Sequence, residues 1–145
     1  MRQLHIESLF GGEYPHASFH DSTIRKIAVD FLTREAKFDC VVFVGDPDDR
    51  EAQPREASGI LTFTGLLYIT AGPPSSSYPY EEGGLEISYD GPVETTNFKA
   101  PIPTLPETLP EDAFTHCFFV NNWNSFMFIA ATGAHFEWSR VSGTI

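Results

Sequence analysis

Residues 58–72, SGILTFTGLLYITAG, decide the fold class, because polar and apolar side chains alternate with a period of two along a β-prone stretch. Leu61 and Phe63 fall on one face of such a strand, and Ile60 and Thr62 fall on the other. Gly65 interrupts the pattern at a position typical of a β-bulge or of a close approach between backbones. The stretch predicts a long strand with an irregularity at Gly65.

The same period, or the same β-prone composition, recurs along most of the chain. The segments that show it are KFDCVVFVG (37–45), GLEISYD (84–90), AFTHCFFVNN (113–122), SFMFIAAT (125–132) and HFEWSRV (135–141). A two-residue turn at Gly133 and Ala134 would join the last two segments as a hairpin. A single strand bent at Gly133 is the alternative.

Residues 21–36, DSTIRKIAVDFLTREA, fit two structures. Their apolar residues recur at helical spacing, yet most of these residues are β-formers that alternate if Arg25 and Lys26 form a bulge. We favour the strand, because the segment then closes a hairpin onto residues 37–45. A helix at residues 22–34, which would make the fold α+β, is the alternative.

These segments predict one all-β domain over residues 1–145, a length that suits a single core. We expect an antiparallel sandwich or flattened barrel of about seven strands, with long acidic loops. The residues expected in the core are Phe38, Cys40, Val42, Leu61, Phe63, Ile69, Ile87, Phe118, Ile129, Phe136 and Trp138.

The formal net charge of −11 is concentrated in the middle of the chain. Residues 46–112 hold 13 of the 20 acidic residues but only 3 of the 9 lysines and arginines. A negative surface repels phosphate backbones and anionic lipids, which argues against nucleic-acid and membrane binding. It permits a basic protein partner, although the same charge also keeps a protein soluble without serving any partner.

Two further features bear on location. No apolar run reaches the roughly 18 residues of a membrane span, and the N-terminal stretch MRQLHIESLFGGEY lacks the apolar region of a signal peptide. Cys40 and Cys117 lie in apolar runs and outside any C-x-x-C pair, so we expect buried, reduced thiols. These features predict a cytoplasmic protein and leave its oligomeric state open.

Long segments rich in Pro, Gly, Ser and acidic residues separate the strands, and loops of this length often carry binding surfaces. Carboxylates on such a surface steer encounter with a basic partner, and aromatic side chains supply central affinity. The candidate binding residues are therefore Asp46, Asp48, Asp49, Glu51, Tyr78, Tyr80 and Trp123.

His16, His20 and Asp21 have the spacing of a metal site, provided that residues 15–20 form a helical turn. A simpler interpretation is a turn in which Phe19 packs into the core and Asp21 accepts backbone N–H groups. Under that interpretation the protein binds no metal.

His135 and Glu137 share a strand face as an i, i+2 pair, for which a solvated face is the simpler interpretation. The sequence contains no nucleophile elbow, phosphate-binding loop or H-E-x-x-H zinc motif. We therefore expect no catalytic residue and no cofactor.

Residues 19–22, FHDS, precede a β-prone stretch, a hairpin, a strand with Leu61, Phe63 and Gly65, and a terminal aromatic strand that ends in F-E-W. This order resembles small bacterial domains of unknown function, some of which are grouped with immunity proteins of polymorphic toxin systems. The resemblance implies a mainly β domain that binds and neutralises another protein, and it implies no catalytic residues.

Three function classes follow. The first, which we favour, is a protein-binding module of immunity or antitoxin type. The second is a small-molecule binder in which the 20 aromatic residues, 13 of them Phe, line the interior of a barrel or sandwich. The third is a metal-dependent enzyme that uses His16, His20 and Asp21.

Overall fold

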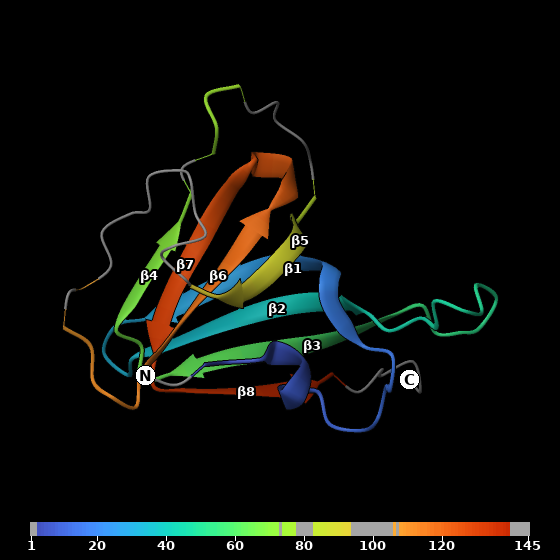
Figure 1. Cartoon of the computed structure of the whole chain (residues 1–145), viewed down its shortest axis with the longest axis horizontal. Helices are drawn as coiled ribbons and strands as arrows, with labels where there is room; N and C mark the ends of the chain where they lie inside the picture. Colours follow the sequence, from blue (N-terminus) through green and yellow to red (C-terminus); the bar gives the residue numbers. More distant parts are fainter. Residues whose placement is uncertain (1–2, 73, 78–82, 94–105, 107, 140–145) are drawn as a thin grey trace.

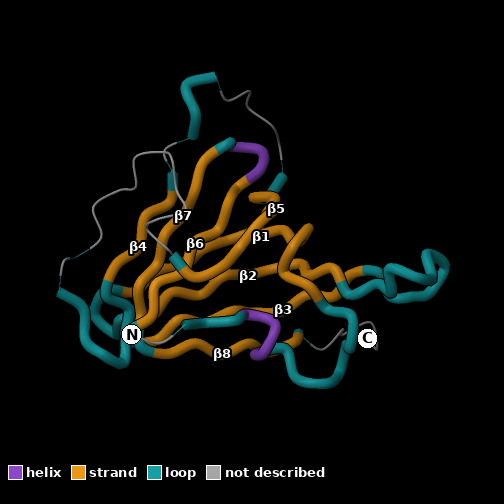
Figure 2. The backbone as a smooth tube through the Cα atoms, viewed as in Figure 1, coloured by secondary structure: helices purple, strands orange, loops and turns teal. Residues whose placement is uncertain are grey.

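A computed structural model shows a mainly β fold and describes residues 3–72, 74–77, 83–93, 106 and 108–139 (Figures 1 and 2). Its elements are η1 (Ile6–Leu9), β1 (Ser18–Asp30), β2 (Glu35–Phe43), β3 (Glu56–Thr64), β4 (Tyr68–Ala71), β5 (Leu85–Pro92), β6 (Phe114–Val120), η3 (Asn121–Trp123), β7 (Ser125–Ala131) and β8 (Gly133–Trp138). The predicted all-β class is confirmed, with eight strands in place of about seven. Within the described ranges, no helix has the length and apolar character needed to cross a membrane.

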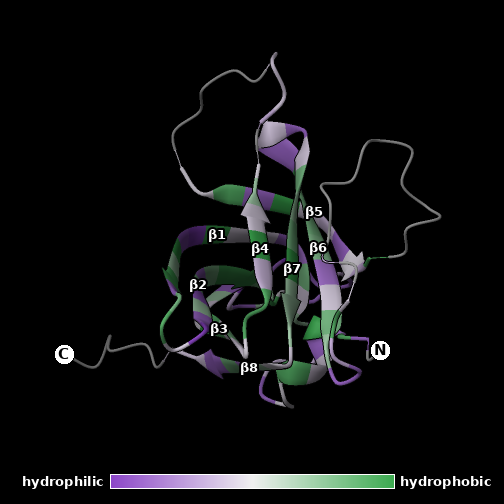
Figure 3. Ribbon diagram, turned by 90° about the vertical axis from the view of Figure 1, so that its left-hand side faces the viewer, coloured by the Kyte–Doolittle hydropathy of each residue, from purple (hydrophilic) through white to green (hydrophobic). Residues whose placement is uncertain are grey.

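The eight strands form one antiparallel sheet in the order β4-β7-β6-β5-β1-β2-β3-β8. The sheet is folded over, so that β4, β7 and β6 run across the direction of β1, β2, β3 and β8 (Figure 3). It is not closed into a barrel, so the observed architecture is the sandwich type.

The two halves of the sheet meet at a corner formed by two bent segments. β3 continues into β4, β7 continues into β8, and the two segments pair with each other along both halves. At the corner the Leu67 N–H donates to the Ala130 carbonyl at 2.8 Å, and the Thr132 N–H donates to the Thr64 carbonyl at 3.2 Å. Gly65 lies between β3 and β4 with a φ of 58°, which confirms the predicted irregularity.

The hairpin predicted at Gly133 and Ala134 is wrong. β8 pairs with β3 instead of folding back on β7, so β7 and β8 form one strand that bends at Thr132. The alternative of a bent strand therefore describes the structure. Local sequence favoured the hairpin, but pairing with the distant strand β3 determined the outcome.

We expect Gly65→Ala to lower the free energy of unfolding by about 1–3 kcal/mol. The positive φ disfavours any L side chain, and an added Cβ would collide with the Thr132 hydroxyl. Gly12→Ala is the matched control, because a Cβ on Gly12 meets nothing within 4 Å. Urea unfolding of both variants provides the measurement, and equal stability of Gly65→Ala and wild type would contradict the corner geometry.

β1 is a strand throughout the ambiguous segment, so the helix alternative at residues 22–34 is wrong. Its register against β2 shifts between Ile24 and Lys26, which confirms the predicted bulge at Arg25 and Lys26. The bulge lets the apolar residues of β1 return to the inner face after two consecutive basic residues.

Phenylalanine side chains fill the space between the two halves of the sheet. The ring centroid of Phe118 lies 5.5 Å from that of Phe19, 5.8 Å from Phe38 and 6.4 Å from Phe63, and all four residues are fully buried. These rings contact one another as a packed core. Of the predicted core, Phe38, Cys40, Val42, Leu61, Phe63, Ile87, Phe118 and Ile129 are buried, and Ile69, Phe136 and Trp138 are half-buried against the same core.

The segment before β1 packs against β8, a contact that the sequence did not predict. The Phe10 ring lies 4.9 Å from Phe136 and 5.3 Å from Trp138, and the Tyr14 ring lies 4.7 Å from Trp138. The Trp138 indole N–H also donates to the Phe10 carbonyl at 2.9 Å. These contacts join the N-terminal segment to the last strand.

Candidate functional site

The loop between β2 and β3 projects from the end of the sheet (Figure 1). It carries Asp46, Asp48, Asp49 and Glu51, so the structure brings four predicted binding residues together. The Asp46 carboxylate accepts the Asp48 N–H at 2.8 Å, and the Asp49 carboxylate accepts the Glu51 N–H at 3.1 Å. Such side-chain turns hold the backbone in a defined shape around the acidic groups.

Arg55 holds the base of this loop. Its guanidinium donates to the carbonyls of Asp46 at 3.2 Å and Asp49 at 2.9 Å, and it lies 5.1 Å from the centre of the Phe43 ring. The Val44 N–H donates to the Arg55 carbonyl at 2.9 Å and extends the hairpin. The guanidinium binds backbone carbonyls, so it neutralises none of the loop carboxylates directly; those of Asp48, Asp49 and Glu51 are exposed, and Asp46 is half-buried.

The structure separates the residues of the proposed metal site. His16 Nε2 faces Asp46 at 3.6 Å, whereas His20 Nδ1 faces Asp21 at 3.1 Å. The helical turn that the metal hypothesis requires over residues 15–20 does not form, because β1 already begins at Ser18. In the described part of the chain, no group of three or more His, Cys, Asp and Glu side chains could hold a metal ion. The metal hypothesis based on His16, His20 and Asp21 therefore gains no structural support.

Asp21 lies at a second bulge of β1. The register against β2 shifts between Ser18 and Thr23, and Asp21 has a φ of 67°. Within this irregularity the Ser22 hydroxyl donates to the Ser18 carbonyl at 3.0 Å. The predicted turn is therefore wrong, although Phe19 does pack into the core as expected.

Trp123, predicted as an exposed anchor, is half-buried in η3 and packs against the core. Its neighbour Asn122 clamps the start of β5: the side-chain oxygen accepts the Glu86 N–H, and the side-chain amide donates to the Gly84 carbonyl, both at 3.1 Å. Residues 121–124, which are rich in Asn, thus stabilise the fold. The other two predicted anchors, Tyr78 and Tyr80, lie outside the described residues.

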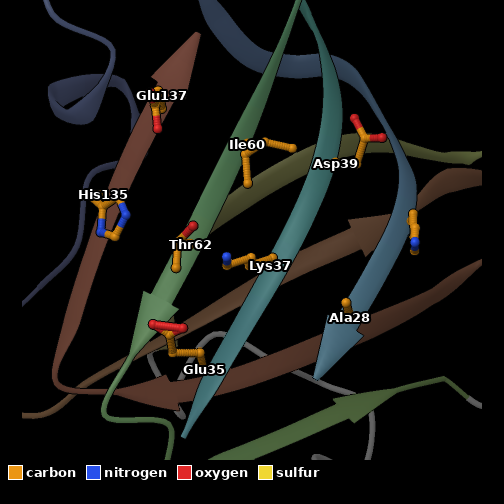
Figure 4. A pocket seen from close by; sticks show the side chains of 9 residues that line it. Ala28, Glu35, Lys37, Asp39, Ile60, Thr62, His135 and Glu137 are labelled. Carbon is orange, nitrogen blue, oxygen red and sulfur yellow. The ribbon is translucent and has the colours of Figure 1, made fainter. Parts of the chain in front are cut away.

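A groove of about 490 Å³ crosses the outer face of β1, β2, β3 and β8 (Figure 4). Residues that face each other across antiparallel strands point to the same side of the sheet, and two such rows line most of the groove. The first row is Ala28, Lys37, Thr62 and His135, and the second is Lys26, Asp39, Ile60 and Glu137. The sequence placed only His135 and Glu137 together, because a single sequence does not show the register between distant strands.

Charged side chains dominate this groove, and only part of the charge is paired. The Arg25 guanidinium, beside the groove at the bulge of β1, lies 2.7 Å from the Asp39 carboxylate. Lys26, Lys37 and Glu137 make no ion pair with any residue that the structure describes. The face therefore offers free charges of both signs to a second molecule.

A histidine–aspartate pair is buried on the inner face of the sheet. His116 Nε2 lies 2.8 Å from the Asp90 carboxylate, and the two side chains are 0% and 8% exposed. The His116 ring packs against Phe118 with a centroid distance of 5.2 Å. The other ring nitrogen, Nδ1, has no hydrogen-bond partner. In the neutral tautomer that carries its proton on Nε2, this proton is donated to Asp90, and no buried N–H group is left unpaired. The pair thus satisfies the Nε2 proton within an apolar core, while Nδ1 remains a buried acceptor without a hydrogen-bond partner.

Both cysteines are buried and free, as predicted. Burial raises the pKa of Cys40 and of Cys117 to about 12, and the nearby carboxylates of Asp39 and Asp90 add to the respective shifts. The raised pKa values keep both thiols protonated near neutral pH, and the thiolate is the reactive form. His116 precedes Cys117 in a strand and points to the opposite face, so the two do not form a catalytic couple.

Comparisons with known proteins find no relative of this chain. No family model, no curated protein and no solved structure matches it. The fold and the surface therefore define the class of protein: an all-β antiparallel sandwich with a projecting acidic loop at one end and a charged groove on one face.

Proposed function

We propose that this protein is a protein-binding module of immunity or antitoxin type, and that its projecting acidic loop binds a basic protein partner. The observation that carries the proposal is the loop over residues 44–55. Asp48, Asp49 and Glu51 are exposed there, on a backbone held by its own hydrogen bonds and by Arg55.

A loop held in shape before binding loses little conformational freedom when a partner arrives. The net charge of −11 adds a long-range field that attracts a cationic surface and repels nucleic acid. Both effects favour fast association with a basic protein. Residues 19–22 and the order of segments along the sequence resemble small bacterial domains of unknown function, some of them grouped with immunity proteins, and this resemblance supports a neutralising role for that contact.

Two other expectations accompany this proposal. We expect a cytoplasmic location, supported by the two free cysteines, because reduced thiols persist in that compartment. We expect no enzymatic activity; His16 and His20 face different carboxylates, Asp46 and Asp21.

Neutralising the loop should slow association with the partner about tenfold or more at low salt, because charges at the rim of an interface act mainly on encounter. The variant replaces Asp46, Asp48 and Asp49 by Asn and Glu51 by Gln. Asn keeps the oxygen that accepts the backbone N–H, so the loop retains its turns. The partner is first captured at low ionic strength and identified, and the product of any adjacent toxin gene is tested directly. Stopped-flow mixing then measures the association and dissociation rate constants.

The matched control removes four carboxylates outside the loop by replacing Asp21 by Asn and Glu13, Glu86 and Glu111 by Gln. It makes the net charge less negative by the same amount, so it isolates the effect of position. Equal association rates for the loop variant and this control would refute the loop as a recognition surface.

A further inference from the structure

A buried threonine lines the groove on the outer face of β1, β2, β3 and β8. Thr62 is only 4% exposed, and Figure 4 shows it between Lys37 and His135. Its hydroxyl makes no hydrogen bond with any residue that the structure describes. A buried hydroxyl without a partner costs free energy, and a ligand that accepts a hydrogen bond from it removes this cost.

Two further hydrogen-bond donors flank Thr62 in the register of the sheet. Lys37 of β2 lies directly opposite Thr62 on one side, and His135 of β8 lies directly opposite it on the other. The Cβ atoms of such pairs are about 4.5–5.5 Å apart, so an ammonium, a hydroxyl and an imidazole form one row. A carboxylate can accept hydrogen bonds from several donors at once, and this donor row therefore suits a carboxylate.

Carboxylates lie on both sides of the donor row. Glu35 precedes Lys37 by two residues on β2, and Glu137 follows His135 by two residues on β8. Both line the groove, and neither makes an ion pair with a residue in the described ranges. Residues two apart on a strand share a face and are about 7 Å apart. An ammonium close to a carboxylate bound on the donor row would therefore lie within reach of Glu35 or Glu137.

The unpaired charges of the groove balance one another. Lys26 and Lys37 supply two positive charges and Glu35 and Glu137 supply two negative ones, whereas Asp39 is already paired. An anion would gain the lysines but meet two carboxylates, and a cation would meet two lysines. A molecule that carries one charge of each sign finds a partner for both. Charge complementarity therefore selects a zwitterion.

The groove also has room and apolar surface for the rest of such a molecule. Ile60 lies beside the donor row and Ala28 lies at its end, and both are half-buried in the lining. The volume of about 490 Å³ is within the range of about 300–1,000 Å³ typical of small-molecule sites. An aliphatic side chain can pack on this surface while the charged groups meet their partners.

We propose that this groove binds a small zwitterion with a carboxylate and an ammonium, the chemistry shared by free amino acids and short peptides. The carboxylate accepts hydrogen bonds from Lys37, Thr62 and His135. The ammonium faces Glu137, and an aliphatic side chain packs on Ile60. None of these residues belongs to the acidic loop, so the proposal does not rest on the proposed function.

An NMR titration of the isotope-labelled full chain with L-leucine tests the proposal. The backbone amides of Lys37, Thr62 and His135 should shift with a dissociation constant of about 1–10 mM, as for a small ligand in an open groove. N-acetyl-L-leucine lacks the ammonium and L-leucinamide lacks the carboxylate, so each should bind at least about threefold more weakly. Tighter binding of L-leucyl-L-leucine than of L-leucine would assign the groove to peptides, and the reverse order would assign it to free amino acids.

Thr62→Val separates a binding role from a structural one. Valine keeps the shape of threonine and lacks the donor, so the variant should bind L-leucine about fivefold more weakly. In urea unfolding it should be no less stable than wild type, because the lost hydroxyl has no partner among the described residues. Lower stability with unchanged binding would show that Thr62 serves only the fold, and would overturn the proposal.

Charge variants test the two ends of the ligand. Lys37→Gln and Glu137→Gln should each weaken binding of L-leucine about threefold. Glu111→Gln, an exposed position outside the groove, is the matched control and should bind as wild type does. The acidic-loop variant should also bind L-leucine normally, so failure of one proposal leaves the other standing. No shifts at about 50 mM L-leucine, or equal binding of L-leucine and N-acetyl-L-leucine, would refute the zwitterion site.

Discussion

Asp90→Ala should lower the free energy of unfolding by about 3 kcal/mol, among the largest effects that we expect from a single substitution in this protein. The change leaves the fully buried His116 ring with no hydrogen-bond partner on either nitrogen. A buried polar group without a partner loses its hydration on folding and gains nothing in exchange. Urea unfolding at pH 7, with an unchanged denaturant slope, provides the measurement.

Two variants separate this loss from a simple change of shape. Asp90→Asn keeps an oxygen that accepts the His116 Nε2 proton, so it should cost clearly less than Asp90→Ala. The double variant Asp90→Ala, His116→Phe removes both polar groups, and its cost should fall well below the sum of the two single costs. Additive costs, or a loss below about 1 kcal/mol for Asp90→Ala, would show that the hydrogen bond contributes little.

Phe118→Ala should destabilise the protein by about 3–5 kcal/mol, because it opens a cavity at the centre of the aromatic core. The Phe118 ring contacts Phe19, Phe38, Phe63 and His116, and it is fully buried. Few of these neighbours are free to fill the space, since interiors are close-packed and rigid. Chemical denaturation of the variant gives the magnitude directly.

The same substitution at an exposed position is the control. Phe31→Ala removes an identical side chain from a residue that is 70% exposed, and it should change stability by less than about 0.5 kcal/mol in dilute solution. Phe118→Leu should fall between the two, because it keeps most of the apolar volume. Similar costs for Phe118→Ala and Phe31→Ala would contradict the central place of Phe118 in the core.

Local signals in the sequence were sufficient for most of the strands. Alternation with a period of two predicted the strand around Phe63, and the pair of bases Arg25 and Lys26 predicted the bulge of β1. Gly65 predicted an irregularity within one long strand, whereas the structure has two strands, β3 and β4, joined at that position. These features depend on a few neighbouring residues, so a single sequence contains them.

A single sequence did not reveal the features that depend on pairing between strands distant in the sequence. Alternation along GLEISYD places Leu85, Ile87 and Tyr89 on one face of a strand, but a register shift between Ile87 and Tyr89 leaves Tyr89 exposed. No glycine marks that bulge in the sequence. The His135 side chain likewise joins Lys37 only because β2, β3 and β8 lie side by side in the folded sheet.

The sequence likewise predicted only part of the candidate binding surface. The four carboxylates of the loop after β2 lie together because they are close in sequence. Trp123 was a candidate because aromatic side chains on loops supply affinity, whereas its indole packs on the core while Asn122 binds the start of β5. Among the described residues, the exposed large aromatic side chains are instead Phe31 and Tyr89.

The corner at Gly65 and Thr132 has a consequence for how the protein folds and opens. The strand pair that bends there belongs to both halves of the sheet, so neither half has a complete set of backbone partners without the other. Partial opening of one half would break hydrogen bonds in the other, which favours a single cooperative unit. Pairing of β3 with β8 also closes a long loop of chain. Contacts between residues far apart in the sequence must therefore form before the sheet is complete, and we expect slow folding for this reason. The amide of Leu67 should therefore exchange with solvent only when the whole molecule unfolds.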